Sequence, residues 1–383
     1  VSIPPFLSVT AGHRTRPRAS SSRDAESEKA FLKNWPSFRG PNAIGRATYA
    51  NPPLKWSTAD GTAVLWKIAL PKHGMSSPIA WENRIFLTGA DDLSRQIYCF
   101  DAHTGKLLWT HDVKKIPGSP PGDELPDVLA ETGFAAPTPI TNGRYVAAIF
   151  GTGELVCVNM EGKRIWAKHL GTPKNSYGHA SSLISQKDLL FVQYDQKDNS
   201  RLFAFDMASG NLAWQANRGV ISWSSPILID NNGRTELILT NCKAVDSYDP
   251  RTGKLLWHVD CLGGEVAPSA AYADGIVFVA VDHATATAID VSDHVSEPAI
   301  LWQWDEALPD AASPLANDKY LVLPTAYGVV SCLDAKTGER FWEQEFDVGF
   351  YSSPILVNDR VYIIDLSGAM QVFRMHDEFE LLG

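Results

Sequence analysis

A hairpin motif that recurs along the chain places the tightest constraint on its fold. In its complete form an Asp is followed three residues later by Thr-Gly, and then by Trp four residues after the glycine, as in residues 101–109, 249–257 and 334–342. Residues 206–214 have Ser in place of Thr, and residues 159–166 begin with Asn and are one residue shorter. Asp caps its own turn through its carboxylate, and Gly supplies the positive φ that a tight hairpin requires. The motif therefore predicts β-hairpins, each with a tryptophan in its second strand.

The spacing of these tryptophans indicates a repeated unit. Trp109, Trp166, Trp214, Trp257, Trp302 and Trp342 are separated by 40 to 57 residues. Two apolar, β-branched runs precede each hairpin, so that one unit contains four short strands. Such a unit, with an aromatic residue at a fixed place, is typical of a propeller blade, whereas a helical solenoid would show a 3.6-residue period. We predict an all-β fold, a β-propeller of four-stranded antiparallel blades in one domain over residues 35–383.

Seven units can be counted from their opening signals, which are small residues usually followed by proline. These openings begin at Ser76, Thr138, Ser181, Ser224, Ser269, Ser313 and Ser352. Residues 64–67 hold Trp66 with no opening strands before them, so we predict that this N-terminal strand closes the ring as the outer strand of the C-terminal blade. Residues 378–382 also have the character of an outer strand. In that alternative Trp66 belongs to an eighth blade without inner strands, as in an eight-bladed propeller truncated at Gly383.

The first 34 residues and the overall charge limit the classes of function. Residues 1–34 contain six Lys or Arg against three Asp or Glu and no apolar period, and we predict a disordered leader or linker there. The chain begins with Val, and a removed signal peptide is neither indicated nor excluded. No apolar run approaches the roughly 18 residues of a transmembrane helix. Because the net charge is −10, we expect no nucleic-acid partner.

The repeat resembles that of a known family. The Ser-Pro opening, the Asp-x-x-Thr-Gly-Lys-x-x-Trp hairpin and the period in the forties are similar to the PQQ-like (pyrroloquinoline quinone) propeller repeat, which quinoprotein dehydrogenases and BamB-like propellers share. The segment Trp35–Asn42 resembles the one that precedes the first strand in secreted propellers of this superfamily. The resemblance implies a periplasmic or secreted protein, and a non-catalytic, BamB-like scaffold or ligand-binding module.

An enzyme of the quinoprotein type is the alternative. The resemblance implies that such an enzyme holds PQQ between a tryptophan and a disulfide of adjacent cysteines, with calcium bound by Glu, Asn and Asp. This chain has five cysteines and no adjacent pair or CxxC, which also argues against a zinc site or a disulfide framework. No HExxH, GxSxG or P-loop motif is present, and residues 230–233 are predicted to be a turn and not a calcium loop. We therefore assign no catalytic or metal-binding residue and expect no cofactor, with PQQ and calcium kept as the alternative.

A binding site is expected at one mouth of the central channel. There the loops that lead into each blade share a face with the loops between the second and third strands. The candidate ligand-binding residues of this mouth are His73, Met75, Phe134, His179, Trp223, Glu265 and Tyr351. Acidic residues of the same face are predicted to surround it, namely Asp123, Glu124, Asp127 and Glu131 of a long loop, and Asp91, Asp92, Asp195, Asp198 and Asp282.

Several occupants fit such a mouth. It would suit a protein or peptide partner, a small molecule or a sugar, and acid around a cavity would attract a basic peptide or cation. The alternative is that the aromatic side chains only fill a narrow hole and that the acidic residues serve solubility. The pair Asp282 and His283 is interpreted as ordinary surface.

Overall fold

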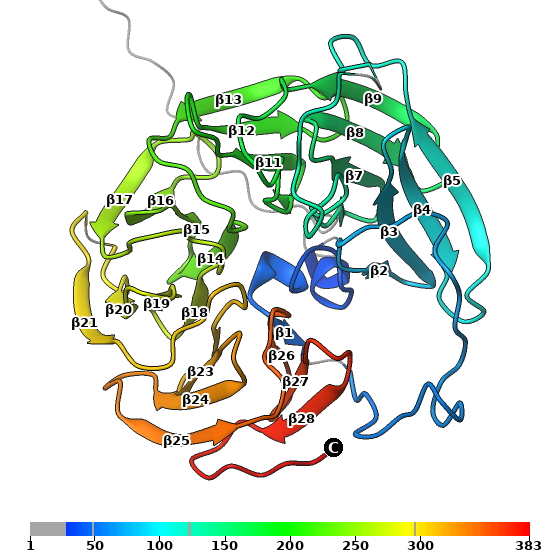
Figure 1. The fold of residues 1–383 in the computed structure, drawn as a ribbon. Helices are drawn as coiled ribbons and strands as arrows, with labels where there is room; N and C mark the ends of the chain where they lie inside the picture. The colour runs from blue at the N-terminus through cyan, green and yellow to red at the C-terminus, as the bar shows by residue number, and fades with distance from the viewer. Residues whose placement is uncertain (1–27, 48–49, 122–123, 295) are drawn as a thin grey trace, which may run out of the picture.

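Seven four-stranded sheets surround a central axis in the computed structural model, which describes residues 28–47, 50–121, 124–294 and 296–383 (Figure 1). Blade 1 contains β2 (Ile79–Trp81), β3 (Arg84–Ala90), β4 (Arg95–Asp101) and β5 (Leu107–Val113); blade 2 contains β6 (Ile140–Thr141), β7 (Tyr145–Ile149), β8 (Glu154–Asn159) and β9 (Arg164–His169). Blade 3 contains β10 (Ile184–Gln186), β11 (Leu189–Tyr194), β12 (Arg201–Asp206) and β13 (Leu212–Asn217); blade 4 contains β14 (Ile227–Asn231), β15 (Arg234–Thr240), β16 (Ala244–Tyr248) and β17 (Leu255–Asp260).

The remaining blades follow the same order from the axis outwards. Blade 5 contains β18 (Ala271–Ala273), β19 (Ile276–Ala280), β20 (Ala286–Asp290) and β21 (Ala299–Trp304); blade 6 contains β22 (Leu315–Ala316), β23 (Tyr320–Pro324), β24 (Val329–Asp334) and β25 (Arg340–Glu345). Blade 7 contains β1 (Arg46–Ala47), β26 (Ile355–Val357), β27 (Arg360–Ile364) and β28 (Met370–Arg374). The predicted all-β propeller of four-stranded blades is confirmed.

The core lies between neighbouring blades. The second and third strands of blade 2, β7 and β8, are buried on both faces. Fourth strands such as β5 are exposed at alternate residues. Phe86 of blade 1, for example, belongs to one buried cluster with Val146 and Val156 of blade 2. Stacking of sheets thus buries the apolar faces that no blade can cover alone.

Four of the repeated tryptophans fasten their blade to the hairpin of the next one. The ring of Trp109 lies on Gly162, whose φ is +79°, and its Nε1 donates a hydrogen bond of 2.9 Å to the carbonyl oxygen of Met160. Trp166, Trp214 and Trp302 dock in the same way on Gly210, Gly253 and Gly338. The hairpin glycine is therefore needed both for its positive φ and for the room it leaves to the indole.

Trp257 departs from this pattern. Its Nε1 donates to Oε2 of Glu236 within blade 4 (2.8 Å), and the indole is almost fully buried. The hairpin of the following blade is the one that carries the extra residues 293–298. Glu236 also accepts hydrogen bonds from Ser247 and Arg234, so the buried carboxylate is satisfied inside its own blade.

The opening motifs form a chain of hydrogen bonds around the axis, which we name the serine ring. The backbone N–H of each of the first six members donates to the side-chain oxygen of its counterpart in the next blade, over 2.8–3.1 Å. Its members in order are Ser77, Thr138, Ser182, Ser225, Ser269, Ser313 and Ser353. No hydrogen bond in the described residues joins Ser353 back to Ser77, so the serine ring is open between blade 7 and blade 1.

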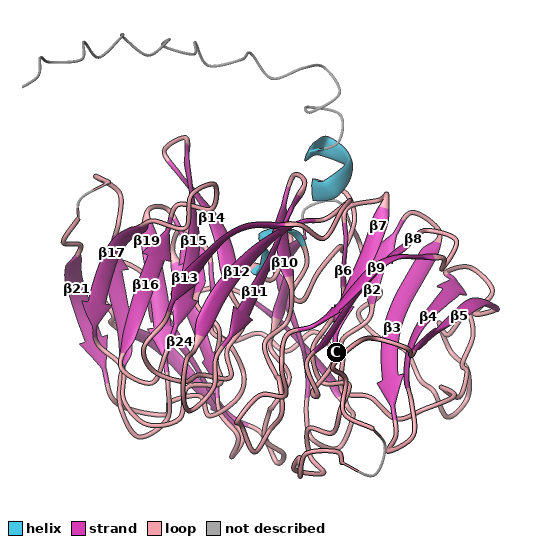
Figure 2. Cartoon of the chain, turned by 90° about the horizontal axis from the view of Figure 1, so that it is seen from above, coloured by secondary structure: helices cyan, strands magenta, loops and turns pink. Residues whose placement is uncertain are grey.

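Residues 35–47 enter the axis from one face and touch every blade; we call them the plug (Figures 1 and 2). The plug includes the 3-10 helix η1 (Pro41–Ala43) and bonds to Ala80 of blade 1, Thr141 of blade 2, Ala270 of blade 5, Pro314 of blade 6 and Leu356 of blade 7, while η1 packs on β10 and β14. Arg39 donates two of these bonds, to the carbonyl oxygens of Ala270 and Pro314. Burial lowers the pKa of Arg39 to about 9.

The ring closes through a different strand from the one predicted. β1 pairs in parallel with β26, with Arg46 opposite Leu356, so the N-terminal contribution to blade 7 is its innermost strand. The outer place is taken by residues 380–383, which exchange backbone hydrogen bonds with Val372 and Arg374. The prediction that Trp66 completes the C-terminal blade is therefore wrong. The N-terminal strand that joins blade 7 is β1 of the plug, and it takes the innermost place. An outer strand within residues 378–382 agrees with the structure.

Residues 28–34, the end of the predicted leader, belong to the part of the chain that the structure describes. Residues 28–32 form a short helix, and Ala30 and Phe31 pack on the core between blades 1 and 2. The rest of the predicted leader, residues 1–27, lies outside the described residues. Within the part of the chain that the structure describes, no helix has the length and hydrophobicity needed to cross a membrane.

Candidate functional site

The mouth lies on the face opposite the side from which the plug enters. Its loops are joined by backbone hydrogen bonds from blade to blade. The N–H of Met75 donates to Ala135 (3.1 Å), the N–H of Gly151 to Phe134 (2.8 Å), and the N–H of His179 to Gly151 (2.9 Å). This ladder brings together three of the predicted residues, Met75, Phe134 and His179.

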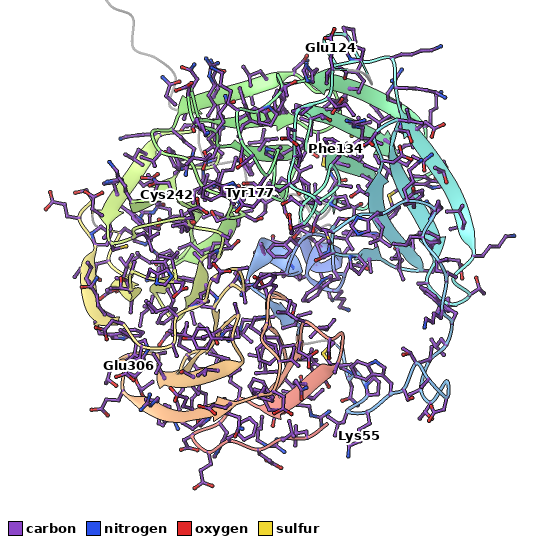
Figure 3. All side chains as sticks on the ribbon, in the orientation of Figure 1. Lys55, Glu124, Phe134, Tyr177, Cys242 and Glu306 are labelled. Atoms are coloured by element: carbon purple, nitrogen blue, oxygen red, sulfur yellow. The ribbon has the colours of Figure 1, made fainter. Side chains whose placement is uncertain are left out.

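Trp223 is held in a fixed orientation at the mouth. Its indole Nε1 donates to Oδ1 of the buried Asn175 (2.9 Å), and its ring meets Tyr177 edge to face with 5.5 Å between centroids. Its backbone N–H donates to Val266, the neighbour of the exposed Glu265. Figure 3 shows Tyr177 and Phe134 on loops directed towards the axis. Asn175 and Tyr177 were not predicted, since nothing in the residues before a blade opening distinguishes them.

The seven predicted residues differ in what they present to solvent. His73, Met75, Glu265 and Tyr351 are exposed, while Phe134 and Trp223 are half-buried. Phe134 is covered on one side by the guanidinium group of Arg95, 4.7 Å from its centroid. Four exposed and two half-buried side chains are therefore accessible for contact with a ligand.

His179 is the exception, since it is buried. Its ring stacks on Tyr194 with 5.1 Å between centroids, and its Nε2 has no hydrogen-bond partner. Burial lowers the pKa of His179 to about 4, against a smaller opposing effect of the hydrogen bond with the Ser181 backbone. The imidazole is thus neutral at pH 7 and is part of the wall beneath the mouth.

A buried charged network joins blades 3 and 4 beside Trp223. Arg218 donates to both oxygens of Asp195 (2.9 and 3.3 Å) and to Asp246 (3.2 Å). Ser222 and Gln193 complete the donors to Asp195. Although burial acts to lower it, the two carboxylates hold the pKa of Arg218 above its usual value. Because its carboxylates are already saturated with donors, the network acts as a clamp between blades and is unsuited to accept a substrate proton.

Asp195 must therefore be removed from the predicted acidic rim. Two further members are neutralised at the surface, since Asp91 pairs with Lys72 and Asp198 with Lys174. Glu124, Asp127, Glu131 and Asp92 remain exposed, and Asp282 is half-buried next to the exposed His283. Asp123 lies outside the described residues. The acid of this face is thus concentrated in the long loop of residues 111–133, with Glu124 at the rim of the ring (Figure 3).

Large apolar side chains are exposed on the mouth face. Six of them, between 44% and 88% exposed, lie in its loops: Met75, Leu93, Leu129, Tyr327, Tyr351 and Leu366. The opposite face is made by polar turns such as Asn142-Gly143-Arg144 and Asn358-Asp359. Sequence reasoning identified Met75 and Tyr351 and missed the other four. The missed signal was an apolar residue inside a tight turn, as in Ala326-Tyr327-Gly328.

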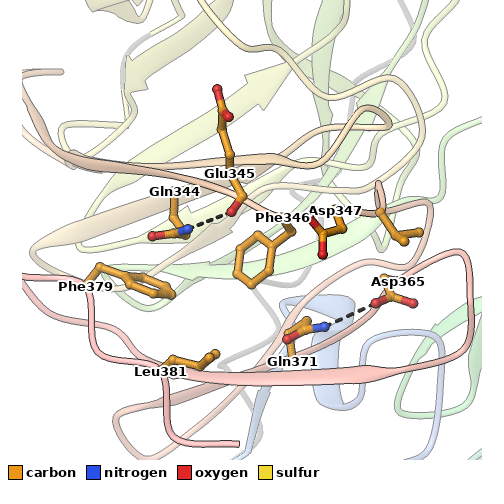
Figure 4. A pocket seen from close by; sticks show the side chains of 9 residues that line it. Gln344, Glu345, Phe346, Asp347, Asp365, Gln371, Phe379 and Leu381 are labelled. Carbon is orange, nitrogen blue, oxygen red and sulfur yellow. Dashed lines mark hydrogen bonds between the residues drawn. The ribbon is translucent and has the colours of Figure 1, made fainter.

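A separate hollow of about 380 Å³ lies where β25 ends beside blade 7 (Figure 4). The rings of Phe346 and Phe379 line it, 6.1 Å apart, together with Asp347 and Asp365. Despite partial burial, hydrogen bonds from Ser367, Gln371 and the backbone of Ala369 hold the pKa of Asp365 below its usual value. This hollow contains none of the predicted site residues.

The described residues include no group of three or more His, Cys, Asp or Glu arranged to hold a metal ion. The five cysteines are unpaired with one another, and Cys99, Cys157 and Cys332 are buried in the third strands of three different blades. The chain therefore offers no adjacent thiols of the kind that the quinoprotein resemblance requires for PQQ.

Comparison with known proteins completes the description. A family profile described as "Outer membrane protein assembly factor BamB" matches residues 47–232, 243–294 and 295–377. The chain belongs to this family. No individual curated protein sequence matches it significantly.

Two solved structures share the fold of this chain at low sequence identity. BamB from Moraxella catarrhalis superposes with a TM-score of 0.57 at 15% identity, over 76% of this chain and 82% of that one. A europium-containing methanol dehydrogenase superposes with a TM-score of 0.52 at 12% identity, over 91% of each chain. At these identities the two likenesses establish the fold alone.

Proposed function

We propose that this BamB-family propeller is a non-catalytic scaffold that binds a protein or peptide partner with its mouth face. The observation that carries the proposal is the group of exposed large apolar side chains in the loops of that face. Met75, Tyr327 and Tyr351 are each more than half exposed, while the turns of the opposite face are polar. Aromatic residues and methionine are enriched in protein interfaces, and grouped exposed apolar side chains mark interaction sites.

The chemistry of the mouth supports binding over catalysis. A general acid or base needs a free proton-accepting atom close to the reacting group. Asp195 and Asp246 are saturated by donors, and His179 is buried and neutral. We expect no PQQ and no calcium, because the cysteines are dispersed through different blades and no group of three or more His, Cys, Asp or Glu among the described residues is arranged to hold a metal ion. The likeness to a methanol dehydrogenase extends to the fold and gives no support to a dehydrogenase site.

Family membership supports an extracytoplasmic setting. The matching profile is named for an outer membrane assembly factor, and a solved BamB shares the fold. We therefore propose a periplasmic or secreted location and a polypeptide partner, with a sugar or other small molecule as the alternative ligand of the mouth.

Site-specific photo-crosslinking tests this function. A benzoyl-phenylalanine is placed at Tyr327 or Tyr351 on the mouth, and at Lys187 in an exposed turn of the opposite face as the control. In the source cells, we expect one crosslinked species from the two mouth positions and none from position 187. The Met75→Ser substitution should weaken the crosslink from Tyr351. Equal crosslinking from both faces, or saturable binding of PQQ with calcium to the pure protein, would contradict the proposal.

A further inference from the structure

A second hollow, which we name the blade 2–3 hollow, lies where blades 2 and 3 meet, at the end of the strands that belongs to the mouth face. Its volume is about 270 Å³, below the roughly 300–1,000 Å³ of pockets for drug-sized ligands, so it suits a group about as large as one side chain. One wall is the end of β9, and the other is β11, β12 and the loop between them (Figure 1). The lining residues are Leu170, Tyr194, Gln196, Asn199, Arg201 and Phe203.

The walls of the blade 2–3 hollow are largely apolar. Phe203 is half-buried, meets Tyr194 edge to face with 6.3 Å between ring centroids, and stacks on Phe205 at 5.7 Å. Leu170 packs on the same buried cluster from blade 2. The hydroxyl of Tyr194 donates to the carbonyl oxygen of Gly171, so this side chain offers a ligand its ring only. An apolar group therefore has a place between Leu170 and Phe203.

Arg201 brings to this hollow a positive charge that no described carboxylate neutralises. Its one hydrogen bond within the described chain runs from Nη1 to Oε1 of Gln215 over 3.5 Å, which is long and therefore weak. Asp198 of the adjoining loop pairs with Lys174 (3.2 Å) and not with Arg201. A planar guanidinium fork matches the two oxygens of a carboxylate. Arg201 thus keeps donors that an external anion can use.

Two further donors border the hollow. Trp166 and Leu170 both contact blade 3, and since alternate residues of a strand share a face, Lys168 between them points the same way. Lys168 is half-buried and forms no ion pair with the described residues. The side-chain amide of Asn199 on the rim has no hydrogen-bond partner in the described chain. In a chain of net charge −10, the polar side of this hollow is cationic.

The loop that forms the rim is held by its own hydrogen bonds. The side-chain Oε1 of Gln196 accepts the N–H of Lys174 (3.0 Å). The backbone N–H of Gln196 donates to Oγ of Ser200 (3.0 Å), and the Ser200 hydroxyl donates back to the Gln196 carbonyl oxygen (2.7 Å). Asn199 has a φ of +56°, which asparagine tolerates better than most residues. Because the rim is formed in advance, ordering it costs a ligand little affinity.

We propose that the blade 2–3 hollow binds a carboxylate carried by an apolar or aromatic group about the size of one amino-acid side chain. The apolar group lies between Leu170 and Phe203, and the carboxylate accepts hydrogen bonds from Arg201. The C-terminal residue of a polypeptide and a free small carboxylic acid share this chemistry. The hollow contains none of the seven residues predicted for the mouth, so the inference does not rest on the function proposed above.

Three compounds test this chemistry by isothermal titration calorimetry on the full chain. N-acetyl-phenylalanine represents a C-terminal residue, phenylpropionate represents a free acid, and N-acetyl-phenylalaninamide keeps the ring without the carboxylate. We expect saturable binding of the acids, about tenfold or more tighter than that of the amide and weakened by added salt. Tighter binding of N-acetyl-phenylalanine would identify a polypeptide C-terminus as the source, and tighter binding of phenylpropionate a free acid.

Matched variants assign the binding to this hollow. Arg201→Gln should weaken the binding of the acids about tenfold or more, and Arg201→Lys should weaken it less, since lysine keeps the charge and loses the fork. Arg251→Gln is the control, because it removes the same charge from a hairpin turn of the opposite face where the side chain is 83% exposed. Asn199→Asp should also weaken binding, because it puts a carboxylate on the rim at a residue type that tolerates this φ.

Three results would overturn the inference. The first is equal binding of the amide and the acids. The second is the absence of saturable binding by either acid at millimolar concentrations. The third is an unchanged affinity of the folded Arg201→Gln chain. Tyr327→Ser and Tyr351→Ser should leave acid binding unchanged, so that failure of the mouth proposal and failure of this one give different results.

Discussion

The indole ring of Trp66 lies directly on Gly105, where an added Cβ atom would approach the ring to 2.7 Å. The same relationship joins Trp109 to Gly162 and Trp214 to Gly253 at other blade junctions. A single contact between an indole and the bare backbone of a hairpin thus recurs wherever one blade meets the next through this motif. It accounts for both residues of the repeated signature, the glycine and the tryptophan, by one interaction.

The glycine contact can be measured with a pair of matched substitutions. Gly162 and Gly61 have φ of +79° and +80°, but a Cβ at Gly162 would lie 2.6 Å from the ring of Trp109, while Gly61 has open space. Gly61→Ala should cost roughly 1–2 kcal/mol, the usual penalty for the left-handed region. Gly162→Ala should lose at least about 1 kcal/mol more, as overpacked contacts do, in urea unfolding. Equal losses would show that the ring moves aside freely.

The buried network predicts a large effect of one arginine. Arg218→Met removes the partner of Asp195 and Asp246, whose side chains are almost fully buried. Leaving a buried charge unpaired costs about 3–5 kcal/mol, whereas an exposed ion pair contributes about 0–1 kcal/mol. Arg144→Met, which breaks the exposed pair with Asp188, is the control. The free energies of unfolding of the two variants should differ by several-fold, and similar values would contradict the clamp.

His179 predicts a dependence of stability on pH. Its folded-state pKa of about 4 lies below the unfolded value of 6.5, so the unfolded chain takes up the proton first as the pH falls. Stability is therefore complete above about pH 6.5 and falls by up to about 1.4 kcal/mol per pH unit between pH 6.5 and 4. Urea unfolding at pH 7, 6 and 5 should show a flatter profile for His179→Gln than for the wild type. Parallel profiles would mean that the ring is solvated.

The cysteines should be unreactive in the folded protein. Burial raises the pKa of Cys99 and of Cys157 to about 12, and it also raises that of Cys332. Because the thiolate is the reactive form, iodoacetamide at pH 8 should label these three only after unfolding. Burial also raises the pKa of Cys261 to about 12 and raises that of Cys242, but these two are only half-buried, so their accessibility should make them the first to be labelled. Rapid native labelling of Cys157, read by peptide mass spectrometry, would show that the third strand of blade 2 is accessible.

Most of the fold was predictable because the information is local and repeated. The turn residues of 101–109 and the apolar runs before them define strands through short-range preferences, and the repeat tells how many blades they form. Closure of the ring was not predictable in the same way. Pairing of β1 with β26 joins residues from opposite ends of the sequence, and two-residue strands such as Arg46–Ala47 leave no period to detect.

The candidate site was predicted only in outline. Topology placed Met75, Trp223 and Tyr351 on the mouth, since each precedes a blade opening. Burial was not predictable, because it depends on loops from neighbouring blades, and His179 is covered by contacts of this kind. The clamp of Arg218 with Asp195 was missed for the same reason, as its members come from separate strands and loops with no sequence spacing that marks them.

The plug has a consequence for how the molecule comes apart. In an open repeat array each unit contacts only its neighbours, and the ends fray one at a time. Here one short segment contacts every blade, with hydrogen bonds to five of them, as Arg39 makes to blades 5 and 6, so loosening it weakens all of them together. The propeller should therefore melt in a single cooperative transition, in which tryptophan fluorescence and circular dichroism change together.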